Sequence, residues 1–187
     1  TATASGLLAT LAAFYAGADK TRGLTAEDVQ AQSTLDYVAA LEKTVRYYGE
    51  GELAVIERAA KEGQAFLDAF VVQEQMVIRF NQERRGGPRL VGIYPQEGTL
   101  WEDHPMVLLE HPGLQDRQRE TFERWRQFLL GGEAQRLILS LGYRPADLNL
   151  PLGDPITAAN GADPTQPQTT LQIPGSDVIA VVRDAWW

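Results

Sequence analysis

The stretch LVGIYPQEGTLW, residues 90–101, dominates the prediction of the fold. Its apolar start, residues 90–94, predicts a short strand covered on both faces, and Gly98 predicts a turn with a positive φ angle. A second apolar run, residues 69–72, predicts another buried strand. Residues 74–81 fit either a helical turn or an extension of that strand, because periodicity does not separate the two.

Helical patterns surround these two apolar runs. Thr25 and Asp28 stand three residues apart, the spacing of a capping box at the start of a helix. Because strands separated by helices form layered domains, the sequence predicts an α/β fold with a mixed or parallel sheet covered by helices. The predicted helices span residues 5–16, 33–48, 53–62, 115–130 and 132–141, and a last one follows Ser176 and Asp177.

The composition changes near Pro145. Six of the ten prolines lie from Pro145 onward, which predicts an extended, loop-rich tail. Within it, residues 169–174 predict a short edge strand. We therefore divide the chain into a domain over residues 1–145 and a tail with a terminal helix over residues 146–187.

The bulk composition limits the classes of partner. Among 187 residues, 17 are basic and 25 acidic, so the net charge is −8, which argues against nucleic acid and against an anionic membrane surface. No apolar run approaches the ~20 residues that cross a bilayer. The absence of cysteine excludes a disulfide framework and a thiolate metal site. Because the chain begins at Thr1 and opens almost directly onto a helical pattern, without a signal peptide, we expect a piece of a longer protein.

The order of motifs from Leu90 to Pro145 resembles the return crossover and C-terminal helices of bacterial type 2 extracellular solute-binding proteins. In that family a strand leads to Tyr-Pro-x-x-Gly-Thr, His-Pro, a helix ending in a leucine pair, a helix with Ala-Gln, and Gly-aromatic-Arg-Pro. The residues at these positions are Tyr94, Pro95, Gly98, Thr99, His104, Pro105, Leu129, Leu130, Ala134, Gln135, Gly142, Tyr143, Arg144 and Pro145.

The resemblance covers residues 3–145 and implies a periplasmic binding protein type 2-like lobe whose companion lobe is missing. Residues 3–8 resemble the entry to the first helix of the second lobe, and residues 66–74 resemble a buried strand beside the ligand cleft. The segment PTQPQTTL, residues 164–171, resembles the link to a von Willebrand factor type A domain, which would begin beyond Trp187. The resemblance also implies an exported, extracellular or cell-surface bacterial protein that takes part in transport.

Five residues are predicted to contact a ligand. Ser5 and Gly6 stand at the start of the first predicted helix, where free N–H groups hold an anion or a carboxylate, although Ser5 alternatively caps the helix. Gln73 and Glu74 follow a predicted strand at its carboxyl end, where ligands lie in open α/β sheets. Tyr94 ends the other strand, and its hydroxyl either contacts a ligand or has a structural partner.

The sequence contains no clear motif for a metal site, for catalysis or for a cofactor. His104 and His111 are the only histidines, and without partners at ligand spacing they predict loop histidines and no metal site. No nucleophile elbow, phosphate-binding loop or dinucleotide fingerprint is present, so we expect neither catalysis nor a cofactor. Arg144 is predicted to anchor a helix end through a carboxylate or free carbonyls. Trp186 and Trp187 either pack on this domain or belong to an interface.

Two functions follow from these observations. The first is a non-enzymatic extracellular solute-binding module that captures a small-molecule or anionic ligand in a cleft between lobes. The resemblance implies that this module is part of a von Willebrand factor type A-containing surface protein. The second is a structural or protein–protein interaction scaffold that has lost small-ligand binding. Stabilisation by a specific ligand distinguishes the first from the second.

Overall fold

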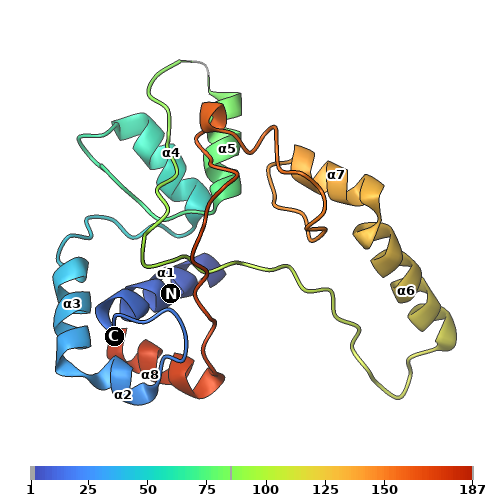
Figure 1. Ribbon diagram of the computed structural model, residues 1–187, viewed down its shortest axis with the longest axis horizontal. Coiled ribbons are helices and arrows are strands. Elements are labelled where there is room, and N and C mark those ends of the chain that lie inside the picture. The colour runs from blue at the N-terminus through green and yellow to red at the C-terminus, as the bar shows by residue number, and fades with distance from the viewer. Residues whose placement is uncertain (1–2, 85, 187) are drawn as a thin grey trace. The chain divides into compact units, whose positions relative to one another are not determined.

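The computed structural model describes residues 3–84 and 86–186. These residues form a helical structure, 49% helix against 1% strand, without a sheet (Figure 1). The predicted α/β fold, with its periplasmic binding protein type 2-like lobe and mixed or parallel sheet, is therefore wrong. The strand content within the described part is an isolated parallel bridge between Thr99 and Thr170.

The two apolar runs that predicted strands have no regular secondary structure, and neither is buried in a sheet. The side chains of Val71, Val91 and Ile93 are 69%, 73% and 81% exposed. An apolar run becomes a buried strand only where neighbouring strands pair with it and other layers cover it. Sequence periodicity reports the preference for an extended backbone, but it does not report whether pairing partners exist.

Eight α-helices and one short 3₁₀ helix make up the regular structure of the described residues. Most of the predicted helices are present with shifted ends, and residues 74–81, whose structure the sequence left open, are helical. The helices are α1 (Ala4–Gly17), α2 (Ala26–Gln30), α3 (Gln32–Glu42), α4 (Glu52–Glu62), α5 (Glu74–Glu83), α6 (Asp116–Leu130), α7 (Gly132–Ser140), η1 (Ala158–Asn160) and α8 (Ser176–Trp186).

Local side-chain chemistry explains several helix ends. The predicted capping box of Thr25 and Asp28 is confirmed at the start of α2. The N-cap of α1 is Thr3, whose hydroxyl accepts a hydrogen bond from the Gly6 N–H, so Ser5 is not the cap. Helix α3 ends at Glu42, earlier than predicted, because the Thr44 hydroxyl bonds to the Leu41 carbonyl at 2.7 Å and competes with helix continuation.

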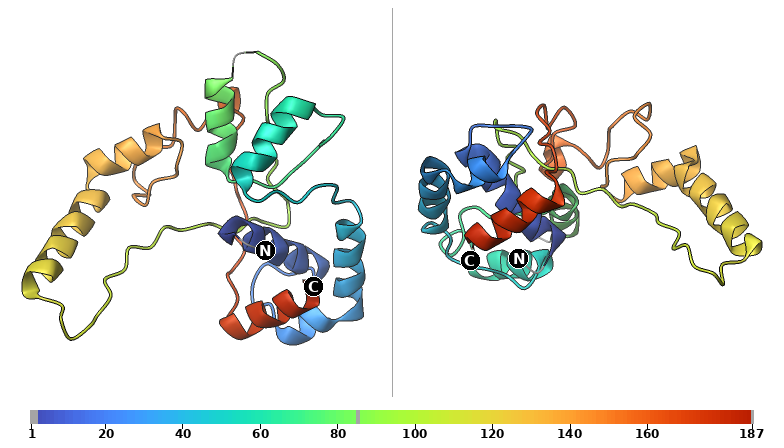
Figure 2. Two further views of the ribbon diagram at one scale, coloured as in Figure 1. Left: turned by 180° about the vertical axis from the view of Figure 1, so that it is seen from behind. Right: turned by 90° about the horizontal axis from the view of Figure 1, so that it is seen from below.

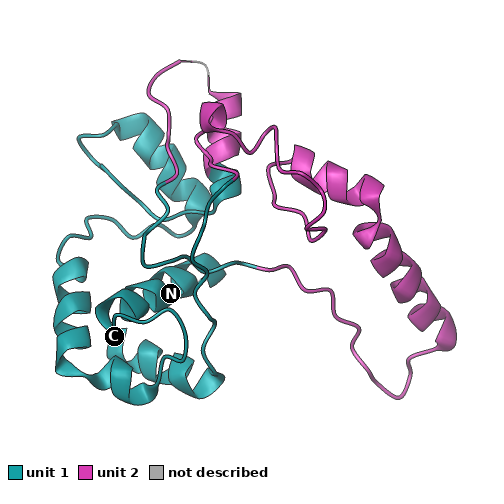
Figure 3. Cartoon of the chain, viewed as in Figure 1, with its two compact units in different colours: residues 1–76, 93–102, 165–187 teal, residues 77–92, 103–164 magenta. Residues whose placement is uncertain are grey.

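Two compact units divide the described chain (Figure 3). Unit 1 comprises residues 1–76, 93–102 and 165–187, and unit 2 comprises residues 77–92 and 103–164. The core of unit 1 lies among α1, α2, α3 and α8. Figures 1 and 2 show α1 beside α3 and α8, and α2 beside α8. Its buried residues are Leu11, Ala13, Phe14, Tyr15, Leu24, Val29, Val38, Leu171, Val178 and Val182.

The C-terminal segment is tied into unit 1 by polar contacts as well. The buried Tyr15 hydroxyl donates to the Gln172 carbonyl at 2.6 Å, and Gln172 N–H donates to the Thr21 carbonyl at 3.0 Å. The Gln172 side chain also accepts from the Gly23 N–H at 3.1 Å. Residue 172 thus holds the loop between α1 and α2 in place.

Unit 2 has a smaller core, formed by Ile78, Ile156 and Ala162. In unit 2 the backbone of Gly161, which has a φ angle of 79°, lies close to the backbone of residues 90–92. The Gly161 carbonyl accepts from Gly92 N–H at 2.7 Å, and the Asn81 side chain bonds to both main-chain groups of Leu90. A Cβ atom at residue 161 would lie 2.4 Å from the Leu90 carbonyl oxygen, so this contact requires glycine.

The net charge is unequally divided between the units. Unit 1 carries 15 acidic and 7 basic residues, which account for the whole net charge of −8. Unit 2 carries 10 acidic residues and 10 arginines, so its net charge is zero. The argument against nucleic acid and anionic membrane surfaces, which used the net charge of the whole chain, therefore does not apply to unit 2.

Candidate functional site

A cluster of polar side chains forms in unit 1 around the carboxylate of Glu102. Oε2 of Glu102 accepts a hydrogen bond from the Ser5 hydroxyl at 3.1 Å and a second one from the Gln73 side-chain amide. Ser5 lies in the first turn of α1, and Gln73 immediately precedes α5. Two residues predicted as ligand contacts, 68 positions apart in the chain, therefore meet on one carboxylate.

Two further carboxylates belong to the same cluster. The main-chain N–H of Gln73 donates to Oε1 of Glu52 at 3.1 Å, at the start of α4. The Tyr94 hydroxyl donates to Oε1 of Glu74, the first residue of α5. We call Ser5, Glu52, Gln73, Glu74, Tyr94 and Glu102 the Glu102 cluster.

The Glu102 cluster is rich in negative charge. Its six residues are partly buried, and three of them are glutamates. Within the described part of the chain, no ion pair joins Glu52 or Glu102 to a cationic side chain. The carboxylates of Glu52 and Glu102 are partly buried and accept hydrogen bonds from neutral donors, so their charge is not balanced by an ion pair, which favours the approach of a cation.

The polar groups at the start of α1, where a ligand contact was predicted at Ser5 and Gly6, have partners within the chain. The Gly6 N–H already donates to the Thr3 hydroxyl at 3.1 Å. The Ser5 hydroxyl donates to Glu102, so a carboxylate of the chain itself lies against the first turn of this helix. An anionic ligand at Ser5 and Gly6 would meet the negative charge of Glu102 and be repelled.

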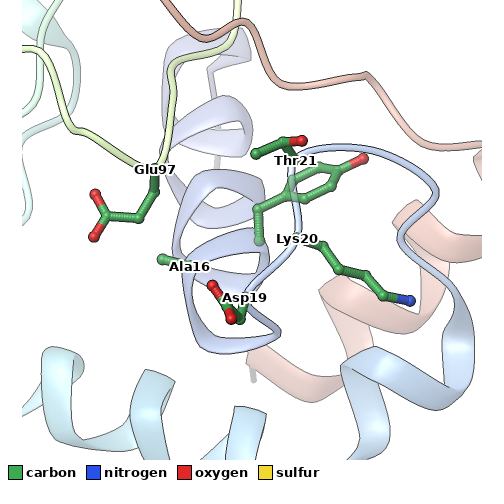
Figure 4. A pocket seen from close by; sticks show the side chains of 6 residues that line it. Ala16, Asp19, Lys20, Thr21 and Glu97 are labelled. Carbon is green, nitrogen blue, oxygen red and sulfur yellow. The ribbon is translucent and has the colours of Figure 1, made fainter.

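A small cavity of about 60 Å³ lies elsewhere in unit 1 (Figure 4). Its walls include Tyr15, Asp19, Lys20 and Glu97, and the Lys20 side chain extends away from Glu97 to pair with Asp28. Burial raises the pKa of the Tyr15 phenol, against the lowering effects of Leu24 and Lys20. The cavity is large enough for a few water molecules but far below the ~300 Å³ of ordinary ligand sites.

An open depression of about 420 Å³ lies at the start of α6 in unit 2. Its lining is polar except for Gly113, and consists of Gln115, Arg117, Gln118 and Thr121. No residue of the predicted site lines it.

The other residues that the sequence singled out have structural partners. The His104 ring meets the Tyr143 ring edge to face at 5.9 Å, and Nδ1 of His111 accepts from the Gly113 N–H. Arg144 donates to the Asp163 carbonyl at 2.9 Å, so it anchors the following tail segment. Trp186 packs against the core of unit 1, and Trp187 lies outside the described residues.

Neither a cluster of metal ligands nor a membrane-spanning helix is present among the described residues. No group of three or more His, Asp or Glu side chains there is arranged to hold a metal ion. None of the helices in residues 3–84 and 86–186 combines the length and apolar character that crossing a bilayer requires.

Sequence reasoning missed the residue at the centre of the cluster. Glu102 follows Trp101 in a segment that predicted only a turn, and no local pattern marks it as a hydrogen-bond acceptor for residues 5 and 73. Glu52 lies one residue before the predicted helix of residues 53–62 and in the first turn of α4, where acidic side chains are favourable, and this position is the local signal that could have found it.

Comparison with known proteins adds no relative: no family model, curated protein or solved structure matches this chain. The resemblance to solute-binding proteins therefore rests on the motifs alone.

Proposed function

We propose that this chain is a non-enzymatic binding module whose Glu102 cluster captures a small ligand bearing an ammonium group. The observation that carries the proposal is the convergence of Ser5 and Gln73 on the Glu102 carboxylate. Segments far apart in the sequence hold this carboxylate in one orientation. A positioned, partly buried carboxylate without an ion-pair partner is suited to bind a cationic group.

The other cluster residues support the same ligand chemistry. The Glu52 carboxylate accepts a hydrogen bond from the Gln73 main-chain N–H, and the carboxylate of Glu74, the residue after Gln73, accepts one from the Tyr94 hydroxyl. An ammonium group donates three hydrogen bonds, so it suits a site that consists mainly of acceptors. We therefore replace the expected anionic ligand with a cationic one.

Glu102→Gln tests the proposal, because it keeps the side-chain shape and removes the charge. The measurement is thermal stability with ethylamine and 1,4-diaminobutane as probes, compared with ethanol and acetate. At a probe concentration tenfold above its dissociation constant, the wild-type chain should gain about 1.4 kcal/mol. The gain should vanish in Glu102→Gln.

Glu97→Gln is the matched control, because Glu97 lies in the same segment, is exposed, and has no place in the cluster. It should respond to the amines as the wild-type chain does. Equal stabilisation of Glu102→Gln and wild type would contradict the proposal, as would a response to acetate and none to amines.

The second candidate function is a protein–protein interaction scaffold, favoured by the exposed apolar segment around residue 91. The main-chain groups of Leu90 and Gly92 bond to Asn81 and Gly161. No hydrogen bond in the described part of the chain engages the main-chain groups of Val91 or Ile93. One edge of this extended segment is thus free to pair with a partner segment, with apolar side chains beside it.

Purified partner candidates test this second function. Val91→Lys should weaken a genuine complex at least tenfold, because it places a charge beside the pairing edge. Leu148→Lys is the control, since Leu148 is also exposed and apolar but lies far along the chain. Equal effects of the two substitutions would indicate nonspecific adhesion and would remove the support for this candidate.

The bacterial, extracellular or cell-surface location and the link to a von Willebrand factor type A domain stay predictions from the resemblance. An exported precursor that is processed by signal peptidase would support the location.

A further inference from the structure

Helix α6 has apolar side chains that the rest of the chain leaves uncovered. None of its fifteen residues is buried. The rings of Trp125 and Phe128 stack at a centroid distance of 5.2 Å, and both side chains are 51% exposed. Figures 1 and 2 show α7 following directly from the end of α6 after a bend, so the contact between the two helices lies at that end of α6.

The charges of α6 follow a definite order around its axis. At 100° per residue, Phe122, Trp125, Phe128 and Leu129 occupy one arc. Arginines flank this arc on both sides, and the acidic residues lie at the opposite pole. The flanking arginines are Arg117 and Arg124 on one side and Arg119 and Arg126 on the other, and the acidic residues are Asp116, Glu120 and Glu123.

The two arginine flanks differ in their partners. Arg119 pairs with Glu110, and Arg126 pairs with Glu123 at 2.7 Å. No ion pair to Arg117 or Arg124 exists among the described residues. Arg117 also lines the open depression of about 420 Å³ at the start of α6, where the side-chain amide of Gln118 adds N–H donors. This flank therefore has two guanidinium groups outside any ion pair, and there is room for a phosphate group beside that of Arg117.

An interface between water and lipid fits this order of side chains. Arginine side chains can lay their aliphatic stems along an apolar layer and extend their guanidinium groups to lipid phosphates. The acidic residues at the far pole would stay in water. The net charge of −8 of the whole chain does not describe the surface that includes α6, because α6 belongs to unit 2, whose net charge is zero.

We propose that α6 is an interfacial helix that binds the surface of a membrane containing anionic phospholipids. The aromatic arc enters the boundary between headgroups and acyl chains, and Arg117 and Arg124 contact the phosphates. The contact needs no membrane-spanning segment. It uses a surface separate from the Glu102 cluster and does not depend on it.

Co-sedimentation of the full chain with lipid vesicles tests this proposal. The vesicles are phosphatidylcholine alone, or phosphatidylcholine and phosphatidylglycerol in equal parts. Wild type should sediment with the anionic vesicles and not with the neutral ones. The double substitution Arg117→Glu and Arg124→Glu should weaken binding at least about tenfold, since each basic residue near the surface contributes about 1 kcal/mol.

Matched variants separate local from general charge effects. Arg22→Glu with Arg79→Glu makes the same change in net charge at exposed positions outside α6 and should retain binding. Trp125→Ser should weaken binding without changing the charge. Glu102→Gln should bind vesicles as wild type does, so failure of this proposal and failure of the ammonium site are distinguishable.

Three results would overturn the membrane contact. One is equal sedimentation of wild type with both kinds of vesicle, or with neither. The second is an equal loss of binding in the Arg22 and Arg79 control. The third is a dimer by light scattering that Trp125→Ser dissociates while vesicles fail to bind, which would assign the aromatic arc to a second copy of this chain.

Discussion

At the scale of single residues, Asp28 combines several contacts at the start of α2. Its carboxylate accepts hydrogen bonds from the Thr25 N–H at 2.9 Å, from the Thr25 hydroxyl and from the Lys20 ammonium group. The hydrogen bond from Lys20, followed by those from Thr25, lowers the pKa of Asp28 below its ordinary value of 3.8 against a raising effect of burial. The ionised form is therefore favoured in the folded chain.

Asp28→Asn should lower the free energy of unfolding at neutral pH by about 1 kcal/mol, because it weakens the capping box. The folded-state pKa lies below the unfolded value, so the contribution is fully present above about pH 4 and is lost as the pH falls through the folded-state pKa. Urea unfolding at neutral and acidic pH measures this. A difference between variant and wild type that grows in acid would contradict the assignment.

Gly161→Ala should destabilise unit 2 by at least about 2 kcal/mol, because the φ angle of 79° disfavours alanine and the added Cβ would meet the Leu90 carbonyl. Gly153→Ala is the control, since no atom lies within 4 Å of its Cβ position. Chemical denaturation followed by circular dichroism measures both. Equal stability of the two variants would show that residues 90 and 161 do not approach as described.

At the scale of elements, periodicity and capping signals predicted most of the helices. They also predicted a sheet, which the described residues do not form. The range of α4 was predicted within one residue, and the start of α2 was predicted from Thr25 and Asp28. The strand prediction failed at residues 69–72 and 90–94 because pairing is a long-range property. Neither run contains information about which segment lies beside it.

In the candidate site, too, local sequence patterns predicted some residues but could not predict a residue whose role depends on distant contacts. Ser5, Gln73, Glu74 and Tyr94 were predicted as polar groups at element ends, and they lie in one cluster with Glu102. Glu102 itself could not be predicted, because its role depends on residues 97 and 29 positions away. Whether these residues contact a ligand stays a prediction.

At the scale of the whole molecule, the two units differ in their cores and therefore in their expected stability. Ten buried residues from four helices and adjoining segments form the core of unit 1, and three buried residues form that of unit 2. Burial of apolar side chains is the main source of folding free energy, so unit 1 should be the more stable part.

Amide hydrogen exchange should show this difference directly. Amides of α1 and α8 should exchange at least about tenfold more slowly than those of α6, a difference of about 1.4 kcal/mol in local opening. Mass spectrometry of peptides from each helix measures it. Uniform protection across α1, α6 and α8 would show that the chain opens as one cooperative body.

An NMR titration of the labelled chain with 1,4-diaminobutane separates a specific ammonium site at Glu102 from general attraction to negative charge. We expect the side-chain carboxyl signal of Glu102 and the side-chain amide signal of Gln73 to shift together with a single dissociation constant. The carboxyl signal of Glu97 should not change. Shifts spread over all exposed carboxylates, or no shift at Glu102, would show that the Glu102 cluster is not an ammonium site.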